Sequence, residues 1–172
     1  GEHALVFQPS GALYFHSPHG GIWLSPVPPY GIIAEWEVIS MGKKVLIIGT
    51  SPRLHGNSNI LARSFAKGAE EAGNEVEFVP MAGKRIGFCI GCWGCLKTKS
   101  CVVNSDDAEE VVQKIRRSDV VVFATPIYYY EMSGQMKTLL DRTNCLYTAD
   151  YDFRDVYLLT TAESGEKDTP QH

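Results

Sequence analysis

The stretch KVLIIGTSPRLHGNSN, residues 44–59, joins an apolar run to a loop of glycine and hydroxyl-bearing residues. Residues 45–48 are all apolar, as is typical of a central parallel strand that is buried on both faces. The loop opens directly into a helical pattern, so its backbone N–H groups lie at a helix N-terminus, where the helix dipole favours an anion. These residues therefore predict a strand, a phosphate-binding loop and a helix in succession.

The side chains of this loop favour the same interpretation. Serine and asparagine can donate hydrogen bonds to a phosphate, and an arginine can neutralise part of its charge. The residues expected at the phosphate are Ser51, Arg53, Gly56, Asn57, Ser58 and Asn59. The chain has no GxGxxG or Walker-type motif, so dinucleotide and nucleoside-triphosphate loops are not the match. Taken alone, the loop is also compatible with a plain turn and helix cap.

Strand and helix patterns alternate from this stretch to about residue 161. Further strands are expected at 75–79, which alternates like an edge strand, at 119–125 and at 155–161. The expected helical stripes are Leu61, Phe65, Gly68, Ala69 and Ala72; Ala108, Val111, Val112 and Ile115; and Met136, Leu139, Leu140 and Thr143. Asp106 followed by Glu109 is a capping-box signal for the second helix. The order predicts an α/β fold with a doubly wound parallel sheet.

Two loops are expected to meet at one edge of this sheet. Ligands of open parallel sheets bind beyond the C-terminal ends of the strands, where the strand order reverses. The phosphate loop and the segment that follows strand 119–125 both leave from that point. The second segment contributes Pro126, Ile127, Tyr128, Tyr129, Tyr130, Ser133 and Gly134, which offer an aromatic and apolar wall for a flat ring. On the next helix, Lys137, Asp141 and Arg142 are expected on the polar face, solvated or ion-paired.

A cluster of cysteines forms a second candidate site. Cys89, Cys92, Cys95 and Cys101 lie within thirteen positions, with Gly91 and Gly94 between them. Thiolates at this spacing can hold one 4Fe–4S cluster, and the glycines let the backbone approach it. Zinc is the second choice because its sites more often use two separated CxxC knuckles, and thiols without a metal remain an alternative. Cys145 is expected to be a small buried residue.

These three segments resemble a known family. The loop GTSPRLHGNSN at 49–59, the segment PIYYYEMSGQMK at 126–137 and the cysteine cluster are similar to the flavodoxin-like NAD(P)H-dependent FMN reductases, most of all to their iron–sulfur flavoprotein branch. The likeness runs from about residue 41 to 161. It implies FMN as the cofactor, NAD(P)H as its electron donor and Thr161 as part of a third loop near the ring.

The resemblance also sets the expected domain organisation. The strand order should be 2-1-3-4 in a flavodoxin-like sheet, with the fifth strand missing or replaced. Residues 41–172 form the FMN-binding domain, which looks C-terminally truncated because a polar run precedes His172. Residues 1–40 hold five of the nine prolines and no helical period, so they are expected to be an N-terminal extension or arm.

The expected function is an FMN-binding oxidoreductase that transfers electrons from NAD(P)H through the flavin to a small-molecule or protein acceptor. No catalytic side chain is assigned, because the flavin carries the chemistry. The alternative is a non-enzymatic electron-transfer iron–sulfur flavoprotein, and a third interpretation is an inert fragment.

Composition limits the partners and the compartment. The net charge of −4 gives no indication of nucleic acid, and no apolar run approaches the roughly 20 residues that span a bilayer. Five cysteines, most of them in one cluster, together with the absence of Lys or Arg from residues 1–42, favour a reducing cytoplasm over secretion. A homodimer or homotetramer is expected, because the arm and the missing fifth strand leave apolar surface to cover.

Overall fold

The computed structural model describes residues 42–163, and its sheet is the predicted parallel one. The strands are β1 (Lys44–Gly49), β2 (Glu75–Pro80), β3 (Val120–Tyr128) and β5 (Asp155–Thr161), in the order β2-β1-β3-β5. A two-residue strand, β4 (Glu131–Met132), pairs antiparallel with the end of β3. The fold class is therefore confirmed. The predicted strand order 2-1-3-4 is confirmed as well, because β5 is the fourth of the predicted strands. Expectations for residues 1–40 and for the polar tail from 164 lie outside the described residues.

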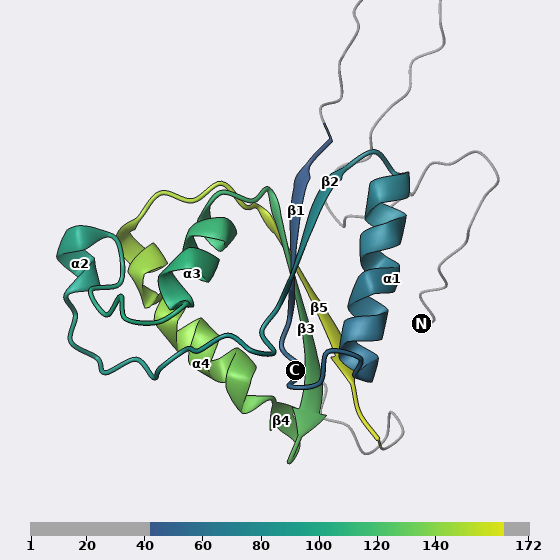
Figure 1. Ribbon diagram of the computed structural model, residues 1–172. Helices are drawn as coiled ribbons and strands as arrows, with labels where there is room; N and C mark the ends of the chain where they lie inside the picture. The colour runs from purple at the N-terminus through teal and green to yellow at the C-terminus, as the bar shows by residue number, and fades with distance from the viewer. Residues whose placement is uncertain (1–41, 164–172) are drawn as a thin grey trace, which may run out of the picture. The chain divides into compact units, whose positions relative to one another are not determined.

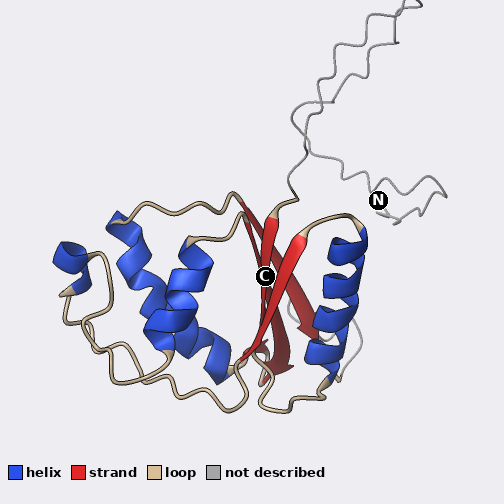
Figure 2. Ribbon diagram, turned by 45° about the horizontal axis from the view of Figure 1, so that its top comes forward, coloured by secondary structure: helices blue, strands red, loops and turns tan. Residues whose placement is uncertain are grey.

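Helices cover both faces of the sheet, as Figures 1 and 2 show. On one face lies α1 (Asn57–Glu71), and on the other lie α3 (Ala108–Arg116) and α4 (Gly134–Arg142). A short helix, α2 (Cys95–Thr98), and the 3-10 turn η1 (Thr143–Thr148) complete the described elements. Within residues 42–163, no helix is long and apolar enough to cross a bilayer.

The alternation of side chains along β1 explains the two layers. Val45 and Ile47 belong to the cluster that packs on α1, whereas Leu46 and Ile48 belong to the cluster under α3 and α4. All four are at most 6 % exposed. Burial of apolar side chains on both faces of one strand is what places β1 in the centre of the sheet.

Each of the two outer strands, β2 and β5, has one face exposed to solvent. In β2, Glu75 and Glu77 are exposed while Val76 and Phe78 pack against the α1 cluster. In β5, Tyr157 and Leu159 pack on the same side, and Val156 and Leu158 are exposed.

The stripe predicted for α1 is wrong in register. The residues of this helix that are buried are Ser58, Asn59, Ala62 and Ala66, while Leu61 is exposed and Phe65 is only partly buried. Small alanines face the sheet because they let the helix axis come close to it, and the longer side chains lie at the margin.

The predicted capping box of α3 is also wrong. Asp106 accepts a hydrogen bond from the Ala108 N–H at 3.1 Å and is ion-paired with Arg142. Glu109 accepts from the Cys101 N–H instead of reaching back to Asp106. The buried stripe itself is confirmed, since Ala108, Val111, Val112 and Ile115 are at most 2 % exposed.

Candidate functional site

Three segments meet beyond the C-terminal ends of the parallel strands. The hydroxyls of Ser58, at the start of α1, and Thr161, at the end of β5, lie 2.7 Å apart. Ser133, which precedes α4, contacts Thr50 at the end of β1. The phosphate-loop segment, the tyrosine segment and the end of β5 are thus brought together, as the crevice prediction requires.

A buried network of hydroxyl groups ties two of these segments together. Ser133 Oγ lies 3.2 Å from both Thr50 Oγ1 and Thr125 Oγ1, and the Ser133 N–H donates to Thr125 Oγ1 at 3.1 Å. All three residues are at most 1 % exposed. The Met136 N–H donates to Ser133 Oγ at 3.3 Å, so this serine also caps α4.

Sequence reasoning placed Ser133 at the cofactor and missed Thr50 and Thr125. The structure gives Ser133 a supporting role beneath the site, and its contact with a ligand stays a prediction. The signal that could have identified the two threonines is a hydroxyl side chain at the C-terminal end of each of two neighbouring parallel strands.

The loop before α1 is held in shape by its own polar groups. The Arg53 N–H donates to Ser51 Oγ at 3.2 Å, and the Gly56 N–H donates to the Arg53 carbonyl at 3.0 Å. A Cβ atom on Gly56 would lie 2.5 Å from Ser51 Oγ and 3.2 Å from the Arg53 carbonyl oxygen, so a larger residue would have to push the Ser51 side chain aside. Asn59 Nδ2 donates to the carbonyls of Arg53 and Leu54 at 3.1 and 3.3 Å.

The N-terminus of α1 suits an anion. Its N-cap residue, Gly56, contributes no side-chain hydrogen bond, and the first turn carries no acidic residue. Such a turn leaves backbone N–H groups for a ligand. Among the predicted contacts, Arg53 and Asn57 are exposed, whereas Ser51, Ser58 and Asn59 are at most 2 % exposed. Asn59 therefore shapes the loop from below, and direct phosphate contact by it stays a prediction.

The tyrosine segment is a tight hairpin between β3 and β4. Ile127 pairs with Met132 and Tyr128 with Glu131, so Tyr129 and Tyr130 occupy the turn. Both have positive φ, 50° and 65°, a conformation that hairpin turns usually fill with Asn or Gly. Bulky residues held there are strained, and such strain gathers at functional sites.

The tyrosine rings of this hairpin are displayed rather than buried. Tyr129 is 95 % exposed and Tyr130 66 %, with their ring centroids 5.9 Å apart in an edge-on arrangement. Pro126 is buried and Ile127 is partly buried. The buried apolar residues thus lie at the start of the segment, and the exposed rings lie in its turn. Gly134 is exposed at the start of α4.

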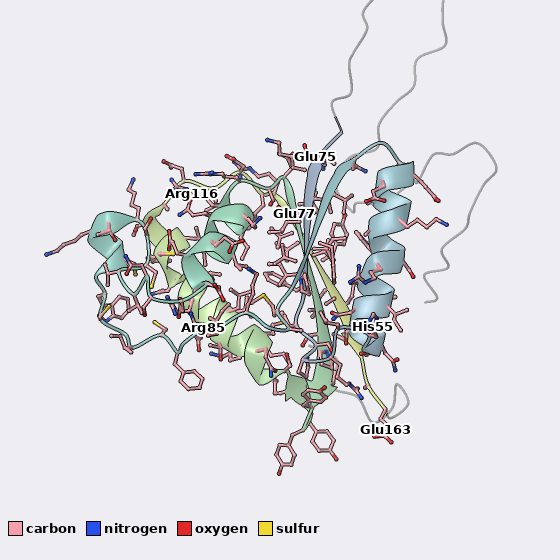
Figure 3. All side chains as sticks on the ribbon, viewed as in Figure 1. His55, Glu75, Glu77, Arg85, Arg116 and Glu163 are labelled. Atoms are coloured by element: carbon pink, nitrogen blue, oxygen red, sulfur yellow. The ribbon has the colours of Figure 1, made fainter. Side chains whose placement is uncertain are left out.

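Figure 3 shows the two ends of the sheet by their labelled residues. His55 and Glu163 lie at the end where the three segments meet, and Glu75 and Glu77 lie towards the opposite end. A cavity of about 420 Å³ between β2 and α3 opens near Glu75, Glu77 and Lys114. Lys114 is ion-paired with Glu77 and Glu110. That cavity lies away from the strand ends where parallel sheets bind ligands.

The four clustered cysteines surround one small cavity. Cys89, Cys92, Cys95 and Cys101 all line it, together with Arg142 and Asn144. Cys89 and Cys92 are exposed, and Cys95 and Cys101 are partly buried. The loop holding them takes left-handed conformations at Gly91, Trp93 and Lys99, which fold it back on itself.

The cysteine loop lies away from the sheet. Helix α2 is found beyond α3 and α4, on their side away from the sheet (Figures 1 and 2). Residues 84–93, which form no helix or strand, carry the chain there from the end of β2.

In the described residues the cysteine side chains do not form a closed metal site. Among residues 42–163, no group of three or more His, Cys, Asp or Glu side chains is close enough to hold one metal ion. A zinc site needs all four sulfurs about 2.3 Å from one atom, whereas each cysteine of a 4Fe–4S cluster binds a different iron. The cavity measures about 20 Å³, which is room for roughly one water molecule. A cluster would therefore require the exposed part of the loop to open.

Arg142 is the residue that sequence reasoning misplaced. It was expected on the polar face of its helix, but it is 2 % exposed and ion-paired with Asp106 at 2.6 Å. The available signal was its position three residues after Leu139, which continues the buried stripe from Met136. Lys137 and Asp141 are ion-paired at 2.6 Å, as expected. Cys145 is 1 % exposed in η1, and burial raises its pKa to about 11.

Several known proteins with related sequences are named iron–sulfur flavoproteins. One from Archaeoglobus fulgidus is 41 % identical over 100 residues, covering 58 % of this chain and 44 % of its own length. One from Methanocaldococcus jannaschii is 36 % identical over 103 residues, covering 60 % of this chain and 53 % of its own. The chain thus spans about half the length of the curated relatives it matches.

Comparisons with solved structures support the fold. The NAD(P)H:quinone oxidoreductase from Methanothermobacter marburgensis superposes with a TM-score of 0.60 at 19 % identity, over 74 % of this chain and 70 % of that one. An azoreductase from Bacillus anthracis gives a TM-score of 0.57 at 16 % identity, over 74 % and 73 %. At such identities the likeness shows the fold alone.

The family model for NADPH-dependent FMN reductases matches residues 43–169, which is well over half of the chain. This match and the flavodoxin-like sheet agree with the resemblance carried by the loop, the tyrosine segment and the cysteines. The chain belongs to the NADPH-dependent FMN reductase family.

Proposed function

We propose that this chain binds FMN at the C-terminal edge of its sheet and passes electrons from NAD(P)H, through the flavin, to a small-molecule or protein acceptor. The observation that carries the proposal is the meeting of the three segments, with Ser58 against Thr161 and Ser133 against Thr50. One segment suits a phosphate, and the next offers apolar and aromatic groups for a flat ring.

The phosphate part rests on the uncapped start of α1. Backbone N–H groups, the positive end of the helix dipole and Arg53 together suit a dianion. Hydrogen bonds from the Arg53 N–H to Ser51 Oγ and from the Gly56 N–H to the Arg53 carbonyl hold the loop in shape. A binding site formed in advance saves the cost of ordering the loop on binding.

The ring part rests on the hairpin after β3. Pro126 and Ile127 form an apolar floor, and Tyr128, Tyr129 and Tyr130 are exposed next to it. Bound FMN would supply hydride and single-electron chemistry, while the protein binds and orients it. The residues of this chain need not transfer protons for hydride to reach the flavin.

The cysteines would bind a second proposed cofactor. Cys89, Cys92, Cys95 and Cys101 would hold a 4Fe–4S cluster, which supplies one-electron transfer when bound. Support comes from their common cavity and from the names of the related proteins. Replacing any one of them with serine should lower iron and sulfide content after anaerobic reconstitution and leave FMN binding unchanged.

FMN titration of the purified chain tests the flavin site. We expect stoichiometric quenching of flavin fluorescence by the wild type and by Gly68→Ala, because a Cβ at Gly68 meets nothing within 4 Å. Gly56→Ala should weaken binding, since the new Cβ would lie 2.5 Å from Ser51 Oγ and would push the Ser51 side chain out of its place in the loop. Equal affinities for both variants would reject the loop as the phosphate site, and a wild type that binds no FMN would reject the proposal.

A second function, electron transfer without an enzymatic step, is favoured by the exposed cysteine loop. Addition of NADPH to the anaerobic FMN-loaded protein distinguishes a reductase from an electron carrier. Bleaching of the flavin in the absence of other proteins supports the reductase. Reduction only by a chemical reductant or by a reduced ferredoxin-like protein supports the electron carrier.

A further inference from the structure

Arg142 is the largest side chain that is fully buried in the described residues. It lies at the end of α4, and its side chain is 1 % exposed. A buried guanidinium is costly unless it is paired and hydrogen-bonded, because it loses the water that surrounded its charge. The groups that surround Arg142 should therefore explain why the charge is kept there.

The guanidinium joins the two ends of the cysteine loop. Nη1 donates to the Gly87 carbonyl at 3.0 Å, two residues before Cys89. Nη2 donates to the Val103 carbonyl at 2.6 Å, two residues after Cys101. One side chain thus closes the loop that carries all four cysteines.

Asp106 completes this arrangement. It accepts from Nη1 at 2.6 Å and from Nη2 at 3.1 Å, which is the bidentate geometry that fixes an arginine in orientation. The same carboxylate accepts the Gly87 N–H at 2.8 Å. The pair therefore holds the start of the loop through both the N–H and the carbonyl of one residue.

Arg142 also borders the cavity that the cysteines enclose. Asp141, the acidic side chain at that cavity, is ion-paired with Lys137 at 2.6 Å. Nε of Arg142 is buried and has no hydrogen-bond acceptor within residues 42–163. A guanidinium stays protonated in proteins, so a permanent cation lines the same small cavity as Cys101.

Asn144 offers a second donor two residues further on. Its Nδ2 lies 4.0 Å from Cys95 Sγ, within reach of a weak N–H···S contact. The junction of α4 and η1 therefore directs one donor toward Cys95 and places the Arg142 cation at the cavity that the four cysteines line.

We propose that Arg142 is a positioning residue that pre-forms the cysteine loop for an anionic, thiolate-bound cluster, with its guanidinium offsetting the negative charge beside Cys101. The inference rests on the proposed cluster and adds a residue to it. Groups that support ligands from outside tune both metal affinity and reduction potential. Arg142 acts through the loop and through charge, and it need not bind iron itself.

Reconstitution of the full chain with ferrous iron and sulfide under anaerobic conditions tests this role. Arg142→Lys keeps the charge but loses the bidentate fork. We expect it to lower resistance to an iron chelator by about 10- to 100-fold, the usual effect of a supporting group. Asn144→Ala, at an exposed position, should shift the reduction potential of the cluster to more negative values without affecting stability.

Arg116→Lys is the matched control. Arg116 Nε donates to the Asp150 carbonyl at 2.7 Å, outside the cysteine loop. This variant should match the wild type in chelator resistance and potential. Amide hydrogen exchange of the apoprotein should show faster exchange in residues 87–106 for Arg142→Lys alone, whatever the iron content.

The outcomes distinguish a failure of the positioning role of Arg142 from a failure of the proposed cluster. If Arg142→Lys folds and matches the wild type in chelator resistance, potential and exchange, the positioning role is wrong and the cluster stands. Should Arg142→Lys fail to fold, Asp106→Asn, which keeps Arg142 but removes the carboxylate that orients its guanidinium, replaces it, and wild-type chelator resistance and exchange in that variant would reject the positioning role. A wild type that takes up no iron would reject the cluster and this inference together, while FMN binding is read separately.

Discussion

Arg53 lies exposed on the loop between β1 and α1, whereas Ser51 and Ser58 beside it are buried. The charged group of the candidate phosphate site is therefore exposed to solvent, whereas its hydroxyl groups are buried. Buried serines keep the loop in one conformation, and the exposed arginine can turn toward an incoming dianion. The sequence predicted these residue types at this loop, but it could not separate supporting from contacting side chains, because burial depends on residues far along the chain.

The contribution of Arg53 can be measured directly. Arg53→Ala should weaken FMN binding by roughly 1.5–3 kcal/mol, the range for hydrogen bonds to charged groups, which corresponds to an increase in Kd of about 10- to 150-fold. Fluorescence titration gives the Kd. Arg117→Ala removes an equal charge from the exposed end of α3 and should leave the Kd unchanged. If Arg53→Ala binds FMN like the wild type, Arg53 is not part of the site.

At the scale of elements, the strands were predictable and the contacts between helices were not. The apolar runs at 45–48 and 120–124 favoured buried strands, and β5 has the predicted bounds. The capping box failed because Asp106 finds a stronger partner in Arg142, 36 residues away. No local pattern contains that information, and the same long-range pair contacts both ends of the cysteine loop.

Ser133 links elements, so its loss should affect the stability of the whole domain. Ser133→Ala removes the cap of α4 and leaves the Thr50 and Thr125 hydroxyls without a shared partner. We expect the free energy of unfolding to fall by about 1–3 kcal/mol. Urea unfolding measures it. Ser64→Ala, at an exposed position of α1, should change it by less than about 0.5 kcal/mol. Equal stability of the two variants would contradict the network.

The ion pair between α4 and the segment before α3 should make the domain sensitive to acid. Burial acts to raise the pKa of Asp106, but hydrogen bonds from Arg142, Gly87 and Ala108 bring it below the ordinary value of 3.8. Because the unfolded chain takes up this proton at higher pH than the folded chain, the stability contributed by Asp106 is present above about pH 4. It is lost as the pH falls through the folded pKa.

Asp106→Asn therefore tests both the pair and its pH dependence. At neutral pH it should cost roughly 3–5 kcal/mol, because it leaves a buried guanidinium without its counter-charge. The difference from the wild type should shrink below about pH 4, as urea unfolding at several pH values would show. Asp141→Asn breaks an exposed pair with Lys137 and should cost only about 0.3–0.5 kcal/mol. A gap for Asp106→Asn that stays constant down to pH 3 would contradict the assignment.

Among residues 42–163, exposed apolar side chains include groups on β5 and on the cysteine loop. Val156 and Leu158 are 56 % and 51 % exposed on β5, a strand that pairs only with β3 among the described residues. On the cysteine loop, Phe88, Ile90 and Trp93 are 81 %, 72 % and 63 % exposed. Exposed apolar patches and open strand edges commonly mark surfaces that other chains cover. Self-association, expected from the sequence, stays a prediction that these surfaces support.

Leu158→Lys tests whether the open edge contributes to self-association. A lysine on an edge strand opposes pairing with another strand, because its charge would be buried. We expect the wild-type chain to sediment as a dimer or larger species at micromolar concentration and Leu158→Lys to shift toward the monomer. Thr160→Lys places the same charge on the same face of β5, at a residue that contributes little apolar area, and should shift the equilibrium less. A wild type that is already monomeric would show that these surfaces do not join copies of this chain, and equal shifts in the two variants would show that charge, rather than the loss of apolar contact at Leu158, is responsible.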